Sequence, residues 1–185
     1  MTMFKTDKCT RCGECFTRCR YMNLSRQQAI EEIDRLIKGD SGGEVMKKCV
    51  SCQSCDVFCP EDARPYELIL EKLNDKYNKT GLPVRALYML PYQHPNYRED
   101  MVPLMSDREK ELLTSWKKPP KSGEILYPGC NLLTMPLLFD LKVLKNLPVY
   151  GDWEQCCGEP YFRLGALDVV EKIAHKLGSF YTGKG

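Results

Sequence analysis

The sequence predicts an α+β protein, with a mostly helical N-terminal domain followed by a partial α/β domain. Three observations lead to this prediction. Eight of the eleven cysteines in the 185-residue chain fall in two short runs near the N-terminus. Amphipathic helical patterns separate and follow those runs. Beyond residue 123, short apolar stretches alternate with helical ones, as they do in α/β folds. We therefore expect domains at 1–80 and 123–185, joined by a proline-rich connector at 81–122.

The overall composition is that of a folded protein with nearly balanced charge. The hydrophobic share is 43% and the formal net charge is +2, so neither nucleic acid nor an acidic membrane surface is indicated as a partner. The N-terminus has no signal-peptide core, and charged residues interrupt the most apolar stretch, so no membrane-spanning helix is expected. These features favour the cytoplasm, where thiols stay reduced and clustered cysteines usually bind metal.

The two cysteine runs are copies of one pattern. The first reads CTRCGECFTRC and the second CVSCQSCDVFC, and each cysteine of the second lies forty positions after its counterpart. This C-x2-C-x2-C-x3-C spacing is typical of ferredoxins with two 4Fe–4S clusters, in which the fourth cysteine of each run ligates the other cluster. By that rule, one cluster is held by Cys9, Cys12, Cys15 and Cys59. The second is held by Cys49, Cys52, Cys55 and Cys19.

Zinc and disulfides are the alternatives to iron and sulfide. A zinc site needs four ligands, usually as two separated pairs, so three cysteines at successive short spacings, twice over, exceed what it requires. A disulfide framework would need an exporting signal. Six basic residues flank the cysteines, and they either stabilise the reduced clusters, form a solvated basic face that offsets the charge of the clusters, or form a docking patch: Lys8, Arg11, Arg18, Arg20, Lys47 and Lys48.

Two helices are expected around the second run. Ser25 and Gln28 fit a capping box that begins a helix ending near Gly39. Pro65 is suited to the first turn of another helix, which Gly81 ends. Their predicted apolar faces consist of Ile30, Ile33 and Ile37 in the first helix, and Tyr66, Ile69, Leu70, Leu73 and Tyr77 in the second. Within the connector, a capping box at Ser106 and Glu109 predicts one short helix.

The C-terminal part is expected to alternate strand and helix. We predict strands at 124–130 and from 148, and helices over 135–147 and 166–180, with the two strands parallel. Cys130, Cys156 and Cys157 then lie where strands end, at the edge where open α/β sheets bind ligands. Gly158 permits the turn that would bring both adjacent thiols to one site. The alternative is that Cys156 and Cys157 are small buried residues.

The two runs, the connector and the segments YPGC and CCGEP together resemble the CCG-domain iron–sulfur proteins. That family includes heterodisulfide reductase catalytic subunits and the iron–sulfur subunits of glycolate oxidase type. The resemblance implies a third iron–sulfur cluster at Cys130, Cys156 and Cys157. The family's further C-x-x-C does not follow Cys157, so we expect a chain truncated after the first CCG segment, one completed by another polypeptide, or a degenerate version.

We expect an electron-transfer subunit of an oxidoreductase complex rather than a complete enzyme. No dinucleotide-binding or P-loop motif is present in the sequence, so the two-electron chemistry is assigned to a partner, a flavoprotein or another redox subunit. That partner is also the expected route to any peripheral membrane association. Two alternatives stay open: a CCG segment that itself reduces a disulfide at a cluster, and a scaffold that holds the ferredoxin domain in a complex.

Overall fold

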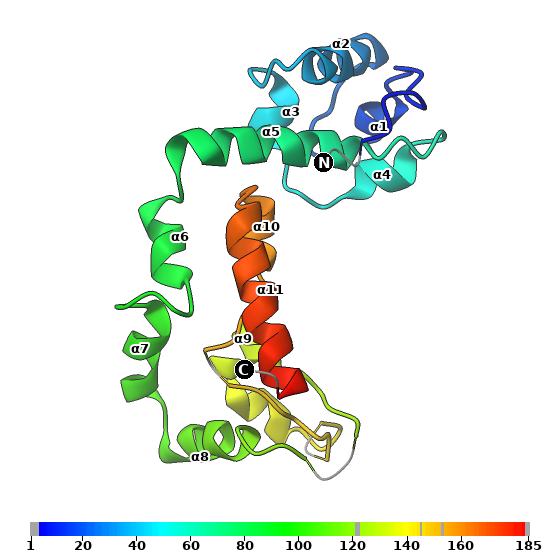
Figure 1. The fold of residues 1–185 in the computed structure, drawn as a ribbon. Helices are drawn as coiled ribbons and strands as arrows, with labels where there is room; N and C mark the ends of the chain where they lie inside the picture. The colour runs from blue at the N-terminus through cyan, green and yellow to red at the C-terminus, as the bar shows by residue number, and fades with distance from the viewer. Residues whose placement is uncertain (1–3, 121–122, 145, 153, 184–185) are drawn as a thin grey trace. The chain divides into compact units, whose positions relative to one another are not determined.

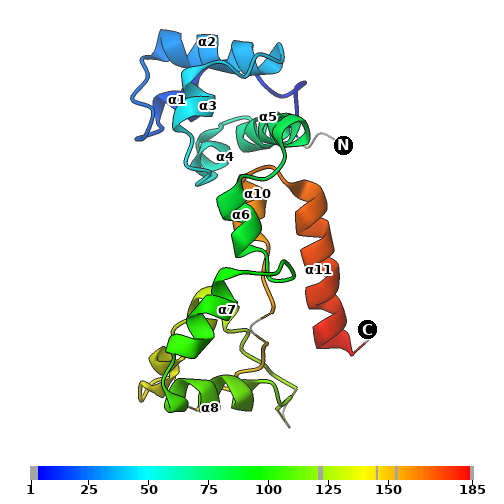
Figure 2. The ribbon, with the colours of Figure 1, turned by 90° about the vertical axis from the view of Figure 1, so that its left-hand side faces the viewer.

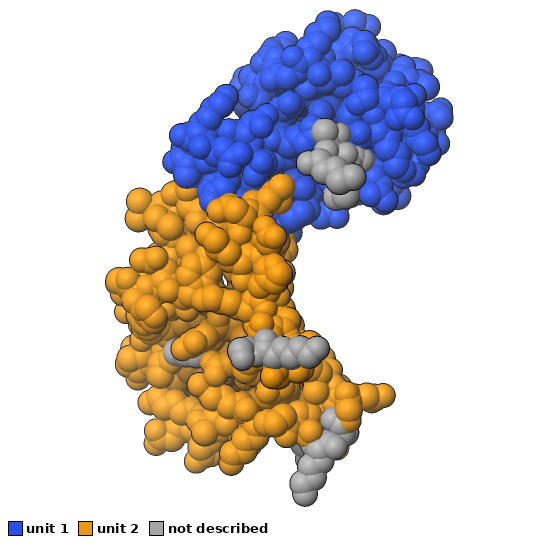
Figure 3. All heavy atoms as spheres, viewed as in Figure 1, with its two compact units in different colours: residues 1–81, 162–166 blue, residues 82–161, 167–185 orange. Residues whose placement is uncertain are grey.

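The structure is a computed structural model that describes residues 4–120, 123–144, 146–152 and 154–183. It divides into two compact units, coloured separately in Figure 3. Unit 1 comprises residues 1–81 together with 162–166, and unit 2 comprises residues 82–161 and 167–185. Among the described residues, no helix is both long and apolar enough to cross a lipid bilayer.

Unit 1 is helical, as predicted, and its helices gather around one core (Figures 1 and 2). Helix α1 packs against α2 and α4, and α5 packs against the same two helices. The centre is filled by side chains such as Phe16, Ile33, Leu36 and Ile69, each at most 1% exposed. The five helices are α1 (Glu14–Thr17), α2 (Arg26–Ile37), α3 (Glu44–Lys48), α4 (Ser54–Phe58) and α5 (Pro65–Thr80).

The two longer helices of unit 1 begin and end where the sequence predicts. Ser25 caps α2, and its hydroxyl accepts from the Gln28 N–H while the Gln28 side chain accepts from the Ser25 N–H, at 3.3 and 2.9 Å. Pro65 begins α5, and Gly81 ends it with a positive φ of 68°. Short-range signals of this kind act within one turn of helix, so they do not depend on the rest of the fold.

Unit 2 is also mostly helical among its described residues. Trp116 and Phe139 meet edge to face at 5.0 Å between ring centroids, and both pack on Leu133. Its helices and 3-10 turns are α6 (Val84–Met89), α7 (Tyr97–Met101), η1 (Val102–Leu104), α8 (Asp107–Trp116), α9 (Gly129–Leu133), η2 (Pro136–Asp140), α10 (Glu159–Arg163) and α11 (Leu167–Thr182), of which α10 continues into unit 1.

The predictions for residues 81–183 hold for two helices only. The helix expected from Ser106 is α8, with its capping box to Glu109, and the helix expected over 166–180 is α11. Helices α6 and α7 lie in the segment where the sequence predicted one helix, so that segment is more ordered than expected.

The α+β fold class is wrong, because the described residues form no sheet. Where two parallel strands were predicted, the structure has a single parallel bridge between Leu126 and Val149. Pro128 and Gly129 follow the first segment at once and lead into α9, while Pro148 precedes the second and lacks the N–H that a longer ladder would use. Pairing therefore stops after one bridge.

The helix predicted over 135–147 is likewise reduced to the 3-10 turn η2. Leu141 and Val143 are 56% and 71% exposed, so the apolar face expected for that helix is not buried. Two residues of the predicted elements lie outside the described residues. Lys145 belongs to the predicted helix, and Trp153 belongs to the predicted second strand and its loop.

A glycine contact within unit 1 yields a stability prediction. Gly165 has a φ of 74°, and a Cβ there would lie 2.4 Å from the backbone N of Asn74 and from the carbonyl carbon of Leu73. We expect Gly165→Ala to lower the free energy of unfolding by about 1–3 kcal/mol from backbone strain, and by more from the clash. Urea unfolding followed by circular dichroism measures this loss.

Gly178→Ala is the matched control. Gly178 lies in α11, and nothing comes within 4 Å of a Cβ built on it. The alanine should therefore stabilise the helix by about 0.5–1 kcal/mol. Equal effects of the two substitutions would contradict the prediction.

Candidate iron–sulfur sites

The two cysteine runs adopt the same backbone conformation. Arg11 and Ser51, which occupy the same place in their runs, have φ values of 58° and 56°. Gly13 and Gln53 also match, at 76° and 62°. Left-handed conformation costs a non-glycine residue about 1–2 kcal/mol, so the turn is imposed by what the runs enclose and pack against, not by local preference.

This turn directs backbone N–H groups at sulfur. The N–H of Ser51 donates to the Cys49 Sγ at 3.4 Å, and the N–H of Arg11 makes the equivalent contact with the Cys9 sulfur. The Ala63 N–H donates to the Cys59 Sγ at 3.3 Å. Such donors stabilise a thiolate, which is the form that binds iron.

A short helix then places the third and fourth cysteines of each run. Gly13 is the N-cap of α1 and Gln53 the N-cap of α4. The third cysteine lies inside the helix, as Cys15 in α1 and Cys55 in α4, and the fourth follows its end. The repeat seen in the sequence is therefore a repeat of structure.

The two runs exchange their fourth cysteines around two cavities. The first cavity is also lined by Ile33, Ala63 and Pro65, and its sulfurs are those of Cys9, Cys12, Cys15 and Cys59. The second cavity is also lined by Phe16, Tyr66 and Ile69, and its sulfurs are those of Cys19, Cys49, Cys52 and Cys55. These are the two crossed sets that the ferredoxin rule predicts as ligands, and ligation itself stays a prediction.

Burial and mutual repulsion shape the electrostatics of both cavities. Burial, with the nearby Cys59, Cys9 and Cys12 sulfurs, raises the pKa of Cys15 to about 12. Burial also raises the pKa of Cys9, Cys49 and Cys55. Cys52 is the exception, because the Ser54 hydroxyl lowers its pKa. Four clustered thiolates therefore need a positive centre between them, and the irons of a cluster provide one.

The donor set fits an iron–sulfur cluster. Each cavity presents four sulfurs, and cysteine thiolates in fours are the usual ligands of 4Fe–4S clusters. The four sulfurs are spread around a cavity rather than gathered at one point. Within the part of the chain that the structure describes, no three His, Cys, Asp or Glu side chains are grouped closely enough to hold one metal ion.

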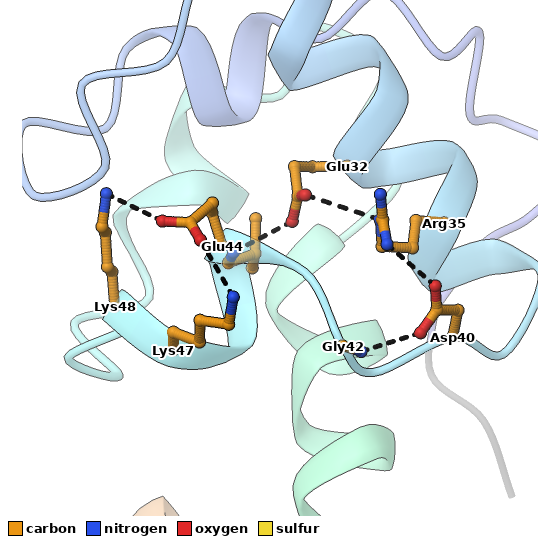
Figure 4. A network of polar contacts seen from close by, with 8 residues as sticks. Glu32, Arg35, Asp40, Gly42, Glu44, Lys47 and Lys48 are labelled. Atoms are coloured by element: carbon orange, nitrogen blue, oxygen red, sulfur yellow. Dashed lines mark hydrogen bonds and ion pairs between the residues drawn. The ribbon is translucent and has the colours of Figure 1, made fainter.

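A buried carboxylate fixes the segment that leads into the second run (Figure 4). Glu32 on α2 is 7% exposed, and its Oε2 accepts from the Val45 N–H in the first turn of α3 at 3.0 Å. Its Oε1 lies 3.6 Å from Arg35. A Cβ on Gly43 would come within 2.2 Å of the same carboxylate. Because α3 ends at Lys48, directly before Cys49, Glu32 and Gly43 together position the start of the second run.

Glu32 was not predicted as a site residue, although the sequence contains a signal for it. Glutamate on a predicted helix is ordinarily a surface residue. Here it lies between Ala29, Ile33 and Leu36 on the buried face of α2. A charged residue at a position where the helical period demands an apolar one indicates a buried partner.

The three C-terminal cysteines are only partly brought together. Cys156 is 4% exposed, Cys130 is half-buried, and Cys157 is exposed. The contact with the Cys130 thiol, and then burial, raise the pKa of Cys156. The Gly158 N–H donates to the Cys156 Sγ at 3.4 Å, and Gly158 has a φ of 82°. Cys156 thus has the same turn and the same donor as the first cysteine of each run.

A tyrosine completes this group. Burial, and then the sulfurs of Cys157, Cys156 and Cys130, raise the pKa of Tyr127. Its hydroxyl is buried and makes no hydrogen bond within the described part of the chain. The Tyr127 phenol is therefore a buried group close enough to the three thiols to interact with them electrostatically.

The comparison with known families agrees with the geometry of unit 1. Residues 5–63 match the family model described as a 4Fe-4S dicluster domain. The N-terminal part of the chain therefore carries a 4Fe-4S dicluster domain, and the matched range contains all eight cysteines of the runs. This supports iron–sulfur clusters and a role in electron transfer. No curated protein and no solved structure matches the chain, and the resemblance to CCG-domain proteins stays a prediction.

The buried carboxylate yields a prediction about the site. Glu32→Ala removes the acceptor of the Val45 N–H and should lower the free energy of unfolding by about 1–3 kcal/mol. It should also make the second run hold its iron less tightly, because α3 loses its fixed start. Urea unfolding and the rate of iron release to a chelator measure the two effects.

Glu31→Ala is the control for that experiment. Glu31 is exposed on the same helix, and its carboxylate accepts a hydrogen bond from Gln27 at 2.9 Å. Its removal should change stability by less than about 0.5 kcal/mol. A loss at position 31 as large as the loss at position 32 would show that the buried contact is unimportant.

Proposed function

We propose that this protein is an electron-transfer subunit that passes single electrons through two 4Fe–4S clusters, between a flavoprotein partner and a site at the CCG segment, residues 156–158. The observation that carries the proposal is the pair of cavities, each lined by three cysteines of one run and the fourth of the other. When bound, such clusters accept and release one electron at a time.

The crossed cysteines hold the two cavities at a fixed spacing. Each run contributes to both, so neither cavity can move without the other. The Cys15 sulfur, from the first set, is among those that raise the pKa of Cys55 in the second, so the sets are neighbours. A fixed, short separation is what transfer between two centres requires.

The surroundings of the cavities tune such a relay. Phe16 and Tyr66 are at most 1% exposed and form part of the apolar inner wall of the second cavity. Backbone N–H donors to the Cys49 and Cys59 sulfurs offset negative charge and so favour the reduced state. The basic residues contribute less, since Arg11 pairs with Asp34 at 3.1 Å and Lys48 pairs with Glu44 at 2.9 Å.

The second candidate function is reduction of a disulfide at the CCG segment. The observation that favours it is the contact between the Cys130 and Cys156 thiols. Cys130, Cys156 and Cys157 would hold a third cluster together with a ligand from a partner. Two electrons, delivered one at a time from the partner through the two 4Fe–4S clusters, would cleave the disulfide into two thiolates, which would take up two protons from solvent.

A set of single cysteine-to-serine variants tests the crossed arrangement. Each variant should lose or shift one of two EPR signals of the reduced protein. Cys59→Ser should affect the same signal as Cys9→Ser, and Cys19→Ser the same signal as Cys49→Ser, because these pairs line the same cavities. Cys157→Ser, at an exposed cysteine, is the control. If Cys59→Ser grouped with Cys49→Ser, the crossed assignment would be wrong.

The iron content separates the two candidate functions. After anaerobic reconstitution, the relay requires about eight irons and eight sulfides per chain, and a third 4Fe–4S cluster raises both to about twelve. Replacing Cys156 by serine should leave a count of eight unchanged. A count of twelve that falls to eight in this variant would favour the second candidate, and zinc without acid-labile sulfide would refute both.

A further inference from the structure

A lysine-rich cleft lies in unit 1, apart from the two cavities. It has a volume of about 540 Å³ and lies between the α2–α3 connection, at residues 39–42, and the outer side of α5. Asp75 is the one acidic residue among those that line it. We name it the lysine cleft after its four lysines, which are Lys47, Lys72, Lys76 and Lys79.

The charge of this cleft is only partly neutralised. The Lys47 Nζ pairs with Glu44 at 3.1 Å, and the Lys72 Nζ lies 3.7 Å from Asp75 although its side chain is only 15% exposed. Lys76 and Lys79 are exposed, and neither forms an ion pair with any residue in the described ranges. The cleft therefore presents net positive charge to solvent, which attracts an anionic partner.

The wall formed by the α2–α3 connection is braced. The Gly42 N–H donates to the Asp40 Oδ1 at 2.8 Å, and the Asp40 Oδ2 pairs with Arg35 at 3.0 Å (Figure 4). Arg35 in turn lies beside the buried Glu32 carboxylate. A wall held in this way gives the cleft a fixed shape, which favours recognition of one surface over adaptation to many ligands.

The cleft adjoins the second run. Met46 and Leu73 line it and also pack against the core of unit 1, as Cys49 does. Lys47 and Lys48 immediately precede Cys49, which the proposed function assigns to the second cluster. A redox partner seated on the lysine cleft would therefore approach the chain at the start of that run.

We propose that the lysine cleft docks an acidic electron-transfer protein that exchanges electrons with the clusters; this rests on the proposed function. The chemistry of the lining favours a protein over a nucleotide, because none of the lining side chains is aromatic and most are polar. Small-molecule sites are mostly apolar and often aromatic. Carboxylates on a protein face complement lysines over a wide area.

Charge reversal and salt dependence test the proposal. The probe is reduced flavodoxin, an acidic flavoprotein, and the readout is the second-order rate of cluster reduction in the reconstituted protein by stopped flow. For the native sequence the rate should fall as salt rises. Lys76→Glu and Lys79→Glu should each lower the low-salt rate by about threefold to tenfold and flatten its salt dependence.

Arg26→Glu is the matched control, with the same change of charge in the same unit. Arg26 begins α2, whose twelve residues separate it by roughly 18 Å from the end of the helix at the cleft. Its rate should stay within about twofold of the native value. If Lys76→Glu and Arg26→Glu slowed reduction equally, the cleft would not be the docking surface.

Two further measurements distinguish failure of the docking proposal from failure of the proposed function. A zwitterionic viologen, which electrostatic steering does not affect, should reduce all variants at one rate. Failure of this reagent with every variant would overturn the proposed function, and the docking proposal with it. Calorimetry with tripolyphosphate tests whether the cleft instead binds a small anion. Micromolar binding that Lys76→Glu abolishes, with flavodoxin rates unchanged, would make the cleft a small-anion site and overturn the proposal.

Discussion

The constraint on which unit 1 depends is the need to bring four sulfurs to each of two cavities from two separate stretches of chain. Because each run gives three sulfurs to one cavity and one to the other, the runs must lie against each other. The packing of α1 on α4, and of α5 on both α2 and α4, meets that need. Residues on these helices, such as Phe16 and Ile69, fill the core and line the second cavity as well.

This constraint explains why the runs keep a conformation that their residues disfavour. Arg11, Ser51 and Gln53 are left-handed although none is glycine, at about 1–2 kcal/mol each. The turn orients the cysteines on either side and aims N–H groups at sulfur. Strain that recurs at matching positions in two copies is characteristic of a functional site, where the surrounding packing holds it in place.

How well the sequence predicted the structure depends on the range of the interactions involved. Capping at Ser25, Pro65 and Ser106 acts within one turn, so α2, α5 and α8 were predicted with their starts. The grouping of the cysteines around two cavities follows the rule for two-cluster ferredoxins, and their role as ligands stays a prediction. The sheet was predicted wrongly, because pairing of Leu126 with Val149 is non-local, and whether it extends beyond one bridge depends on Pro128 and Pro148 in three dimensions. Glu32 was missed for the same reason, since its partner lies thirteen residues away.

The C-terminal cysteines share one local feature with the two runs, but not a complete set of four sulfurs. The Cys156 sulfur accepts a hydrogen bond from the N–H of the residue two positions later, as the sulfurs of Cys9 and Cys49 do, and in each case that residue is left-handed. A 4Fe–4S cluster needs four ligands, however. Of the other two C-terminal cysteines, only Cys130 contacts Cys156, while Cys157 stays exposed. In unit 1 the second run completes each set. Unit 2 has no such second copy among its described residues, so a third cluster there requires both an inward turn of Cys157 and a ligand from elsewhere.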